Sequence, residues 1–355
     1  MVATSSTSTT AAAVRGIICN STTTGVVNTI TNNTVANINS NYSATGTQAA
    51  TLVGIAVTTG ASTVDGNTIY NLSSNTQTSG SGATSGVIGI SYNSTAATAA
   101  PAVISDNIVH TLRLTNPSST GAINGVGLFY SGPTGSSNVI ERNLIHSIST
   151  AATANSLGFL TGMDVAGGVI TLKNNIVRLG IDDAGLDIVS PLTVRGITKN
   201  AATANVWNNS VYIGGANVGT NAINTFAFAR TGTAVDDIRN NIFVNNRSNA
   251  TTGGKHYAIN LVNTTTLTLN YNDYYVSGLG GVLGYNGVAD AAVYTTGWVA
   301  GDVNSFSVDP EFINANGDAA SVDLHIHPTN PTIIEGTGEA IANVVVDFDS
   351  QTELD

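Results

Sequence analysis

The chain has 355 residues, of which 9% are charged and 6% aromatic, whereas glycine alone occupies 38 positions. Globular chains usually carry roughly 25% charged residues, so long surface helices built from Glu, Lys and Arg are not expected. No apolar run approaches the roughly 20 residues of a membrane-spanning helix. Apolar residues reach 42%, too many for a disordered chain. The abundance of Thr, Ser, Asn, Val and Ile indicates a β-rich fold with frequent tight turns.

The net charge of −11 is unevenly distributed. All eleven Lys and Arg residues lie between Arg15 and Lys255, and the stretch from His256 to the end has thirteen acidic residues and no basic one. A nucleic-acid partner needs clustered cations, so this partner class is excluded. The acidic stretch could hold Ca²⁺ weakly, although a solvated acidic face is the commoner outcome. Cys19 is the one cysteine, so an internal disulfide and a thiolate metal cluster are excluded. Apart from weakly bound Ca²⁺, we expect no cofactor.

Residues 1–13 are polar and lack the charged and apolar regions of a secretory signal, so we expect a flexible N-terminal segment. Either a signal has been removed or the chain is cut from a longer one. The polar, cysteine-poor composition suits a secreted or cell-surface location, as one module of a larger secreted protein.

One asparagine recurs along the chain at intervals of 31 to 40 residues. The series consists of Asn33, Asn67, Asn107, Asn143, Asn175, Asn209, Asn241 and Asn272. Three residues earlier stand the aliphatic side chains of Ile30, Val64, Ile104, Ile140, Leu172, Val206, Ile238 and Leu269. Two residues later stand the apolar side chains of Val35, Ile69, Val109, Ile145, Val177, Val211, Phe243 and Tyr274. Both offsets match at every member, so the series marks a structural repeat.

A second series alternates with the first and pairs a small residue with a following apolar one. Its members are Gly16-Ile17, Gly54-Ile55, Gly89-Ile90, Gly125-Val126, Gly162-Met163, Gly196-Ile197, Ala227-Phe228 and Ala258-Ile259. Each repeat therefore contains at least three short apolar segments with β-branched residues, which are typical of strands.

The offsets around the repeated asparagine require a bend. In one regular strand, residues at −3 and +2 would point to opposite faces, because side chains alternate. A bend lets both point inward, and Asn best tolerates, among residues other than glycine, the left-handed conformation that we expect at this position. Stacked Asn side chains could then hydrogen-bond between repeats. We predict an all-β parallel β-helix solenoid of about eight three-strand coils, rather than a propeller, whose antiparallel blades need hairpin signals.

The repeat over residues 14–280 resembles the right-handed parallel β-helix domains of the pectate-lyase-like superfamily. The stretch 281–355 is similar to the closing coils and cap of such domains in secreted multidomain bacterial surface proteins. This likeness is carried by Tyr271-Asn272-Asp273-Tyr274-Tyr275, Val308-Asp309-Pro310-Glu311-Phe312, Asp323-Leu324-His325-Ile326-His327-Pro328, Asn330-Pro331-Thr332-Ile333 and Val346-Asp347-Phe348-Asp349. In enzymes of this fold, the resemblance implies a cleft on the sheet of the Gly-apolar strands. Lyases there use an acidic calcium cluster with an Arg or Lys base, and hydrolases use paired Asp residues.

That face offers few carboxylates. The outward residues that follow the Gly-apolar pairs are predicted to be Ile18, Ala56, Ser91, Gly127, Asp164, Thr198, Ala229 and Asn260. Glycoside hydrolysis needs two carboxylates at a defined separation, and only one is present. A fallback catalytic group would form if the following loop folded over the face, and it would comprise Asp164, Asp182, Asp183, Asp187, Arg195 and Lys199.

A column of large side chains is the better binding candidate. Three residues after the repeated asparagines stand Ala36, Tyr70, His110, His146, Arg178, Tyr212, Val244 and Tyr275. Alternation should place them outward, on coils roughly 4.8 Å apart. A stripe of Tyr70, His110, His146, Arg178, Tyr212 and Tyr275 could hold a glycan, or its members could simply stack on one another. His110 and His146 could share a metal, although surface histidines are usually just solvated.

These patterns favour a non-enzymatic secreted or cell-surface β-helix module that serves as a stalk, an adhesin or a weak glycan-binding surface, with glycans or cell-surface polymers as partners. The alternative is a polysaccharide lyase or glycoside hydrolase acting on an extracellular polysaccharide. A second alternative is an ice-binding solenoid, but no column of Thr residues persists over successive coils.

Overall fold

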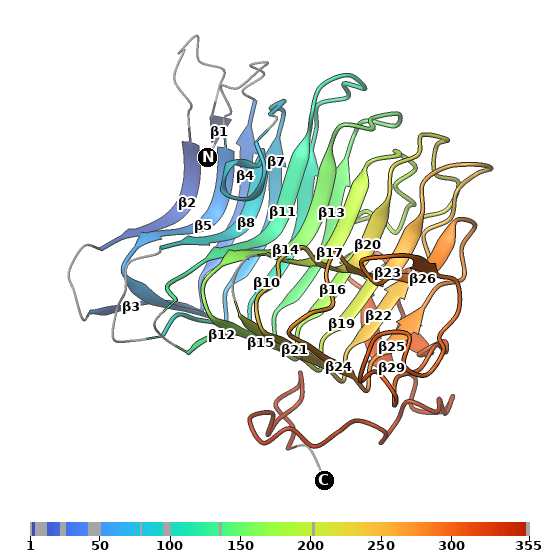
Figure 1. The fold of residues 1–355 in the computed structure, drawn as a ribbon. Helices are drawn as coiled ribbons and strands as arrows, with labels where there is room; N and C mark the ends of the chain where they lie inside the picture. Colours follow the sequence, from blue (N-terminus) through green and yellow to red (C-terminus); the bar gives the residue numbers. More distant parts are fainter. Residues whose placement is uncertain are drawn as a thin grey trace.

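A computed structural model describes residues 2–3, 13–21, 26–41, 51–78, 80–94, 101–134, 137–200 and 203–352. This part of the chain forms an all-β, right-handed parallel β-helix, which confirms the predicted fold class (Figure 1). Its one helical element is a 3-10 turn, η1 (Gly82–Thr84). None of the described segments forms a helix long and apolar enough to span a membrane.

Three sheets form the walls of the solenoid, and their strands from β1 to β26 pair in parallel with the strand three places along the chain, whereas β27 adds an antiparallel strand to β26. Sheet A contains β1 (Val2–Ala3), β4 (Thr34–Ser40), β7 (Thr68–Ser74), β10 (Ile108–Leu114), β13 (Leu144–Thr150), β16 (Ile176–Leu179), β19 (Ser210–Ile213), β22 (Ile242–Asn245) and β25 (Asp273–Tyr275). Sheet B contains β2 (Ala13–Asn20), β5 (Thr51–Thr59), β8 (Val87–Asn93), β11 (Asn124–Ser131), β14 (Phe159–Gly167), β17 (Thr193–Lys199), β20 (Thr225–Arg230), β23 (His256–Leu261), β26 (Gly281–Tyr285) and β27 (Asp290–Ala291). Sheet C contains β3 (Val27–Thr31), β6 (Ala61–Asp65), β9 (Val103–Ser105), β12 (Asn138–Glu141), β15 (Ile170–Lys173), β18 (Ala204–Trp207), β21 (Asp236–Arg239) and β24 (Leu267–Asn270).

Eight strand triplets, from β2–β4 to β23–β25, follow one another in the described part of the chain and together make about seven turns. The apolar residues at −3 and +2 from the repeated asparagines are all buried, as predicted, and belong to the central core. The core is thus a continuous stack of short aliphatic layers, one for each coil, that ends in the aromatic layers of Phe243 and Tyr274.

The bend between sheets C and A is made differently from our expectation. The residue with a left-handed backbone stands one position before the repeated asparagine. These residues are Asn32, Gly66, Asp106, Arg142, Asn174, Asn208, Asn240 and Tyr271, with φ between 52° and 64°. The preceding residue takes the strained conformation, and this leaves the repeated asparagine free to direct its carboxamide into the stack. In four of the repeats both positions are asparagine, so the sequence does not distinguish the left-handed residue from the ladder residue.

The second series also needs one correction. On β11, Leu128 aligns with Ile90 and Met163, so the small residue of that coil is Gly127, not Gly125, and its outward neighbour is Phe129. A Cβ on Gly127 would lie 2.3 Å from Ile145 Cγ2 and 2.8 Å from the Gly162 carbonyl oxygen. Sheets A and B therefore approach closely enough at this column to require glycine.

The residues after β26 do not add further complete coils. The aromatic layer of Tyr274 is closed by Trp298, whose Nε1 donates to Asp302 Oδ2 at 2.6 Å. The C-terminal segment, residues 306–352, then turns back along the solenoid (Figure 1) and contains the antiparallel pair β28 (Phe312–Asn314) and β29 (Asp323–Ile326). Its last part reaches back to sheet C, where Lys173 Nζ donates to the Asn343 carbonyl oxygen at 2.7 Å.

Candidate functional site

The large side chains predicted as a stripe do form one column on the outer side of sheet A. Strand register aligns Tyr70 with His110, His110 with His146, and His146 with Arg178. The rings of Tyr70 and His110 are stacked with centroids 5.2 Å apart, and those of His110 and His146 with centroids 5.0 Å apart. The ring faces that a sugar would need are therefore largely used by neighbouring rings of the same column.

Other members of the column are buried, so the expectation of an open stripe is wrong for His146, Arg178 and Tyr212. Arg178 is fully buried and donates from Nη1 to the Ile181 carbonyl oxygen at 2.7 Å and from Nη2 to the Gly317 carbonyl oxygen at 2.6 Å. Tyr212 donates its hydroxyl to Asn316 Oδ1 at 2.8 Å, and its ring meets Phe312 edge to face. The C-terminal segment thus covers the part of the predicted stripe around Arg178 and Tyr212.

His146 is also buried, with 2% of its surface exposed. Burial lowers its pKa to about 3, aided by the nearby charges of His110 and Arg178. Its Nδ1 lies 3.0 Å from Ser147 Oγ, and the rings of His110 and His146 lie face to face. This pair is therefore a stacking element. Of the predicted stripe, Tyr70, His110 and Tyr275 remain half-buried.

Asp164 lies on the outer side of sheet B, as expected, between Phe129 and Thr198. Burial raises its pKa, and the charge of Arg195 partly opposes this. Arg195 rests over the Phe159 ring, with its Cζ 5.4 Å from the ring centroid. The turn η1 packs close to Phe129 and Asp164. Around Asp164 this face offers one half-buried carboxyl near one guanidinium, and the Asp290 carboxylate on its last strands is paired with Lys255.

The acidic loop folds toward sheet A and not over Asp164. Asp183 binds Arg113 of β10 through both oxygens, with Oδ2 2.5 Å from Nη2. Asp182 Oδ1 accepts the backbone N–H groups of Ala184 and Leu186, which fixes the turn. Asp187 lines a hollow beside Asp182 and Asp183 at the C-terminal ends of β10 and β13. The carboxylates of the fallback catalytic group therefore stay separated from Asp164.

Lys199 lies neither near Asp164 nor near the acidic loop, but in a buried cluster with Asp236 and Arg230. Its Nζ lies 2.5 Å from Asp236 Oδ1, and Arg230 Nε lies 2.7 Å from Asp236 Oδ2; all three side chains are fully buried. Asp236 also accepts the backbone N–H of Ala204 at 2.9 Å. A fully paired buried triad of this kind joins sheets B and C, and it has no solvent-facing group with which to act on a substrate.

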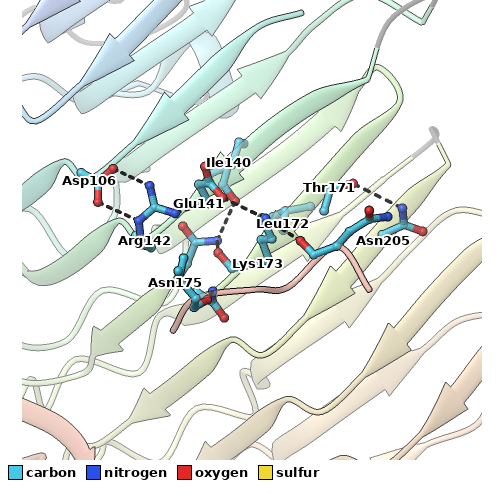
Figure 2. A network of polar contacts seen from close by, with 12 residues as sticks. Asp106, Ile140, Glu141, Arg142, Thr171, Leu172, Lys173, Asn175 and Asn205 are labelled. Atoms are coloured by element: carbon cyan, nitrogen blue, oxygen red, sulfur yellow. Dashed lines mark hydrogen bonds and ion pairs between the residues drawn. The ribbon is translucent and has the colours of Figure 1, made fainter. Parts of the chain in front are cut away.

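A network of surface charges lies along the edge of sheet C (Figure 2). Glu141 accepts from Lys173 Nζ at 3.1 Å and from Arg142 at 3.2 Å, and Arg142 also binds both oxygens of Asp106. Since these charges are paired along successive coils, the network fastens neighbouring repeats. Among the described residues, no group of three or more His, Cys, Asp or Glu side chains is arranged to hold a metal ion, including in the acidic C-terminal stretch.

Two features were not found by sequence reasoning. One is an open groove of about 490 Å³ on the outer side of sheet B, where the rings of Phe226 and Tyr257 stack with centroids 5.5 Å apart. The other is a cavity beside Asp273, beneath the C-terminal segment. The sequence carried a signal only for the cavity, through the aromatic residues around Asp273. Neither feature could be located from the sequence, because each is formed by segments that are distant in the chain.

No protein-family model, no curated protein and no solved structure matches this chain. Of the resemblance to the pectate-lyase-like superfamily, the structure confirms the parallel β-helix architecture.

Proposed function

We propose that this chain is a non-enzymatic β-helix module that serves as a stiff structural stalk within a larger secreted or cell-surface protein. The observation that carries the proposal is the asparagine ladder. Each carboxamide donates to the next, at 2.9 Å in all seven links from Asn33 to Asn272. Ser305 Oγ continues the series by accepting the Asn272 backbone N–H.

The ladder supports a mechanical role because its bonds run in the same direction as the sheet hydrogen bonds, along the solenoid. Both sets of bonds resist a pull along this axis, and every ladder asparagine after the half-buried Asn33 is buried, where a hydrogen bond is stronger than in water. The distance of the acidic loop from Asp164 and the pairing of Lys199 with Asp236 keep the predicted catalytic residues apart, which supports a non-enzymatic role. Low charge and small polar side chains also suit an extracellular spacer.

Two experiments test the stalk. Under single-molecule stretching between the chain ends, we expect Asn143→Ala to lower the unfolding force and the half-buried Asn205→Ala to leave it unchanged. In reducing-end and unsaturated-product assays over a polysaccharide panel, with and without calcium, we expect no turnover. Reproducible turnover that disappears in Asp164→Asn would replace the stalk with a polysaccharide lyase or hydrolase.

Glycan adhesion is a second candidate, now placed on the groove of sheet B. Phe226 and Tyr285 are half-buried there, and Asn260, which is aligned with Tyr285 in the sheet, adds a carboxamide to the lining. Such a shallow groove should bind weakly, since little water is excluded. On a glycan array, binding that is lost in Phe226→Ala and retained in Tyr70→Ala would support this site, whereas the opposite result would return it to sheet A.

A further inference from the structure

The chain contains three Asn-Gly pairs, which are Asn124-Gly125, Asn286-Gly287 and Asn316-Gly317. This dipeptide reacts with itself more readily than other Asn-containing pairs, because glycine has no side chain to keep its backbone nitrogen away from the preceding carboxamide. Attack of that nitrogen on the asparagine Cγ forms a succinimide ring and releases ammonia. Water then opens the ring to aspartate or to isoaspartate, in which the main chain runs through Cγ. The surroundings of each pair decide where this reaction proceeds.

Two of the three pairs are restrained through their carboxamides. Asn124 lies buried in β11, where its Oδ1 accepts the backbone N–H of Phe159 at 3.1 Å and its Nδ2 donates to two backbone carbonyl oxygens. Asn286 Oδ1 accepts the backbone N–H groups of Val288 and Ala289 at 3.1 Å and 3.0 Å. These bonds oppose the rotation that would bring Cγ onto the nitrogen of the following glycine.

Asn316 has a less restrained environment. It is exposed, in the turn that follows β28. Among the described residues, its side chain has one hydrogen bond, which Oδ1 accepts from the Tyr212 hydroxyl at 2.8 Å, so its Nδ2 can leave as ammonia into solvent. The backbone N–H of Gly317 makes only a long bond of 3.4 Å to the Asn314 carbonyl oxygen. The attacking nitrogen and the leaving group are therefore both accessible.

Tyr212 is placed to assist the reaction. When the Gly317 nitrogen attacks, negative charge develops on Asn316 Oδ1, and a donor 2.8 Å from that oxygen stabilises the charge as an oxyanion hole does. Burial raises the pKa of the Tyr212 hydroxyl, against the opposing effect of hydrogen bonds to Asn246 and Asn316. The hydroxyl therefore keeps its proton in mildly alkaline solution, where a backbone nitrogen is deprotonated more often.

The same dipeptide fastens the C-terminal segment to sheet A. Tyr212 binds the Asn316 side chain, and Arg178 Nη2 donates to the Gly317 carbonyl oxygen at 2.6 Å. Isoaspartate lengthens the main chain by one carbon atom between these two contacts. The two contacts then no longer match the spacing of Tyr212 and Arg178 on the sheet.

We propose that Asn316-Gly317 is a self-modification site, at which loss of ammonia from Asn316 loosens the C-terminal segment from sheet A as the protein ages. The bond from the Gly317 nitrogen to Cγ forms while the bond from Cγ to Nδ2 breaks. One water molecule is consumed when the ring opens, and no other reactant is needed. The site is separate from the asparagine ladder, so the proposal stands whether or not the chain is a stalk.

Peptide mapping tests the modification itself. The whole chain is kept at pH 8 for several weeks, digested with pepsin in acid, where the reaction stops, and mapped by mass spectrometry with fragmentation that separates aspartate from isoaspartate. We expect Asn316 to convert to both products at least fivefold faster than Asn124 and Asn286, which serve as internal controls. Conversion of either control at an equal or higher rate would overturn the assignment.

Tyr212→Phe tests the assisting hydroxyl, because it keeps the ring and removes the donor. It should slow conversion of Asn316 at least threefold and leave the rate at Asn286 unchanged. An undiminished rate at Asn316 in this variant would overturn the part assigned to Tyr212.

Thermolysin tests the loosening, since the C-terminal segment has no Lys or Arg for trypsin. The aged natural chain should be cleaved between residues 313 and 326 severalfold faster than the fresh chain. Asn316→Gln keeps a carboxamide but closes a six-membered ring far more slowly, so ageing should not change its cleavage, whereas Asn286→Gln should age like the natural chain. Equal cleavage of fresh and aged natural chain would overturn the proposal. None of these outcomes depends on the ladder, so this proposal and the stalk fail independently.

Discussion

Asn107 donates two hydrogen bonds to one oxygen of Asn143: its backbone N–H reaches Oδ1 at 3.2 Å and its Nδ2 reaches the same atom at 2.9 Å. Asn143 in turn donates from Nδ2 to Asn175 and to the Ile104 carbonyl oxygen. One side chain therefore satisfies polar groups on both neighbouring coils, inside a core that is otherwise apolar.

Replacing Asn143 with Ala should lower the free energy of unfolding by about 2–4 kcal/mol, because several buried donors and acceptors lose their partner together. The backbone bend should survive, since Arg142 and not Asn143 has the left-handed conformation. Urea unfolding followed by circular dichroism measures the change. Asn205→Ala is the control, because its Nδ2 makes a half-buried bond of 3.3 Å to Thr171. A loss below 1 kcal/mol for Asn143→Ala would contradict the ladder's role in stability.

Gly127→Ala should destabilise the fold by roughly 1–3 kcal/mol, because the new methyl group would overlap Ile145 and the Gly162 carbonyl group. Gly125→Ala should cost less, since its nearest contact would be 3.1 Å, to Ile148. Thermal unfolding of the two variants tests the register of β11. If Gly125→Ala were the more damaging change, the alignment of β11 with β8 would be wrong.

Acid should destabilise the protein through its buried histidines. Burial lowers the pKa of His146 to about 3 and that of His256 to about 4. In the unfolded chain both groups take up protons near pH 6.5, so their stabilising effect is complete above that pH and is lost as the pH falls toward 3. Between pH 7 and pH 5, each of these two histidines should lower the free energy of unfolding by about 2 kcal/mol.

The matched variant is His146→Phe, which keeps a ring in the stack and cannot take up a proton. Its free energy of unfolding, relative to the natural chain, should improve by about 2 kcal/mol when the pH falls from 7 to 5. A relative stability that does not change with pH would show that His146 is protonated as easily in the fold as in the unfolded chain.

Arg178→Met should loosen the C-terminal segment, because the bond from Nη2 to the Gly317 carbonyl oxygen is lost. Trypsin cannot cut within this segment, which has no Lys or Arg, so thermolysin is the suitable probe. We expect cleavage between residues 313 and 326 to become severalfold faster, with little change in Arg195→Met on the opposite sheet. Equal cleavage of the natural chain and Arg178→Met would mean that apolar contacts alone hold the segment.

The coil period, the inward residues on both sides of the bend and the column of stacked side chains were all readable from the sequence. Each depends on spacing within one repeat, and side-chain alternation converts that spacing directly into inside and outside. The sequence also located the asparagine column, although the left-handed residue beside it was misassigned. Two adjacent asparagines carry no local signal that tells which one bends the chain.

What surrounds the solenoid was decided only by the tertiary structure. Tyr212 meets Asn316, and Arg178 meets Gly317, across more than a hundred residues. Lys199 finds Asp236 one coil away and not Asp164 on its neighbouring strand. A repeat predicts what each coil presents to the next, because that contact recurs. It does not predict where a unique segment will lie, since that depends on packing and charge pairing that occur only once in the chain.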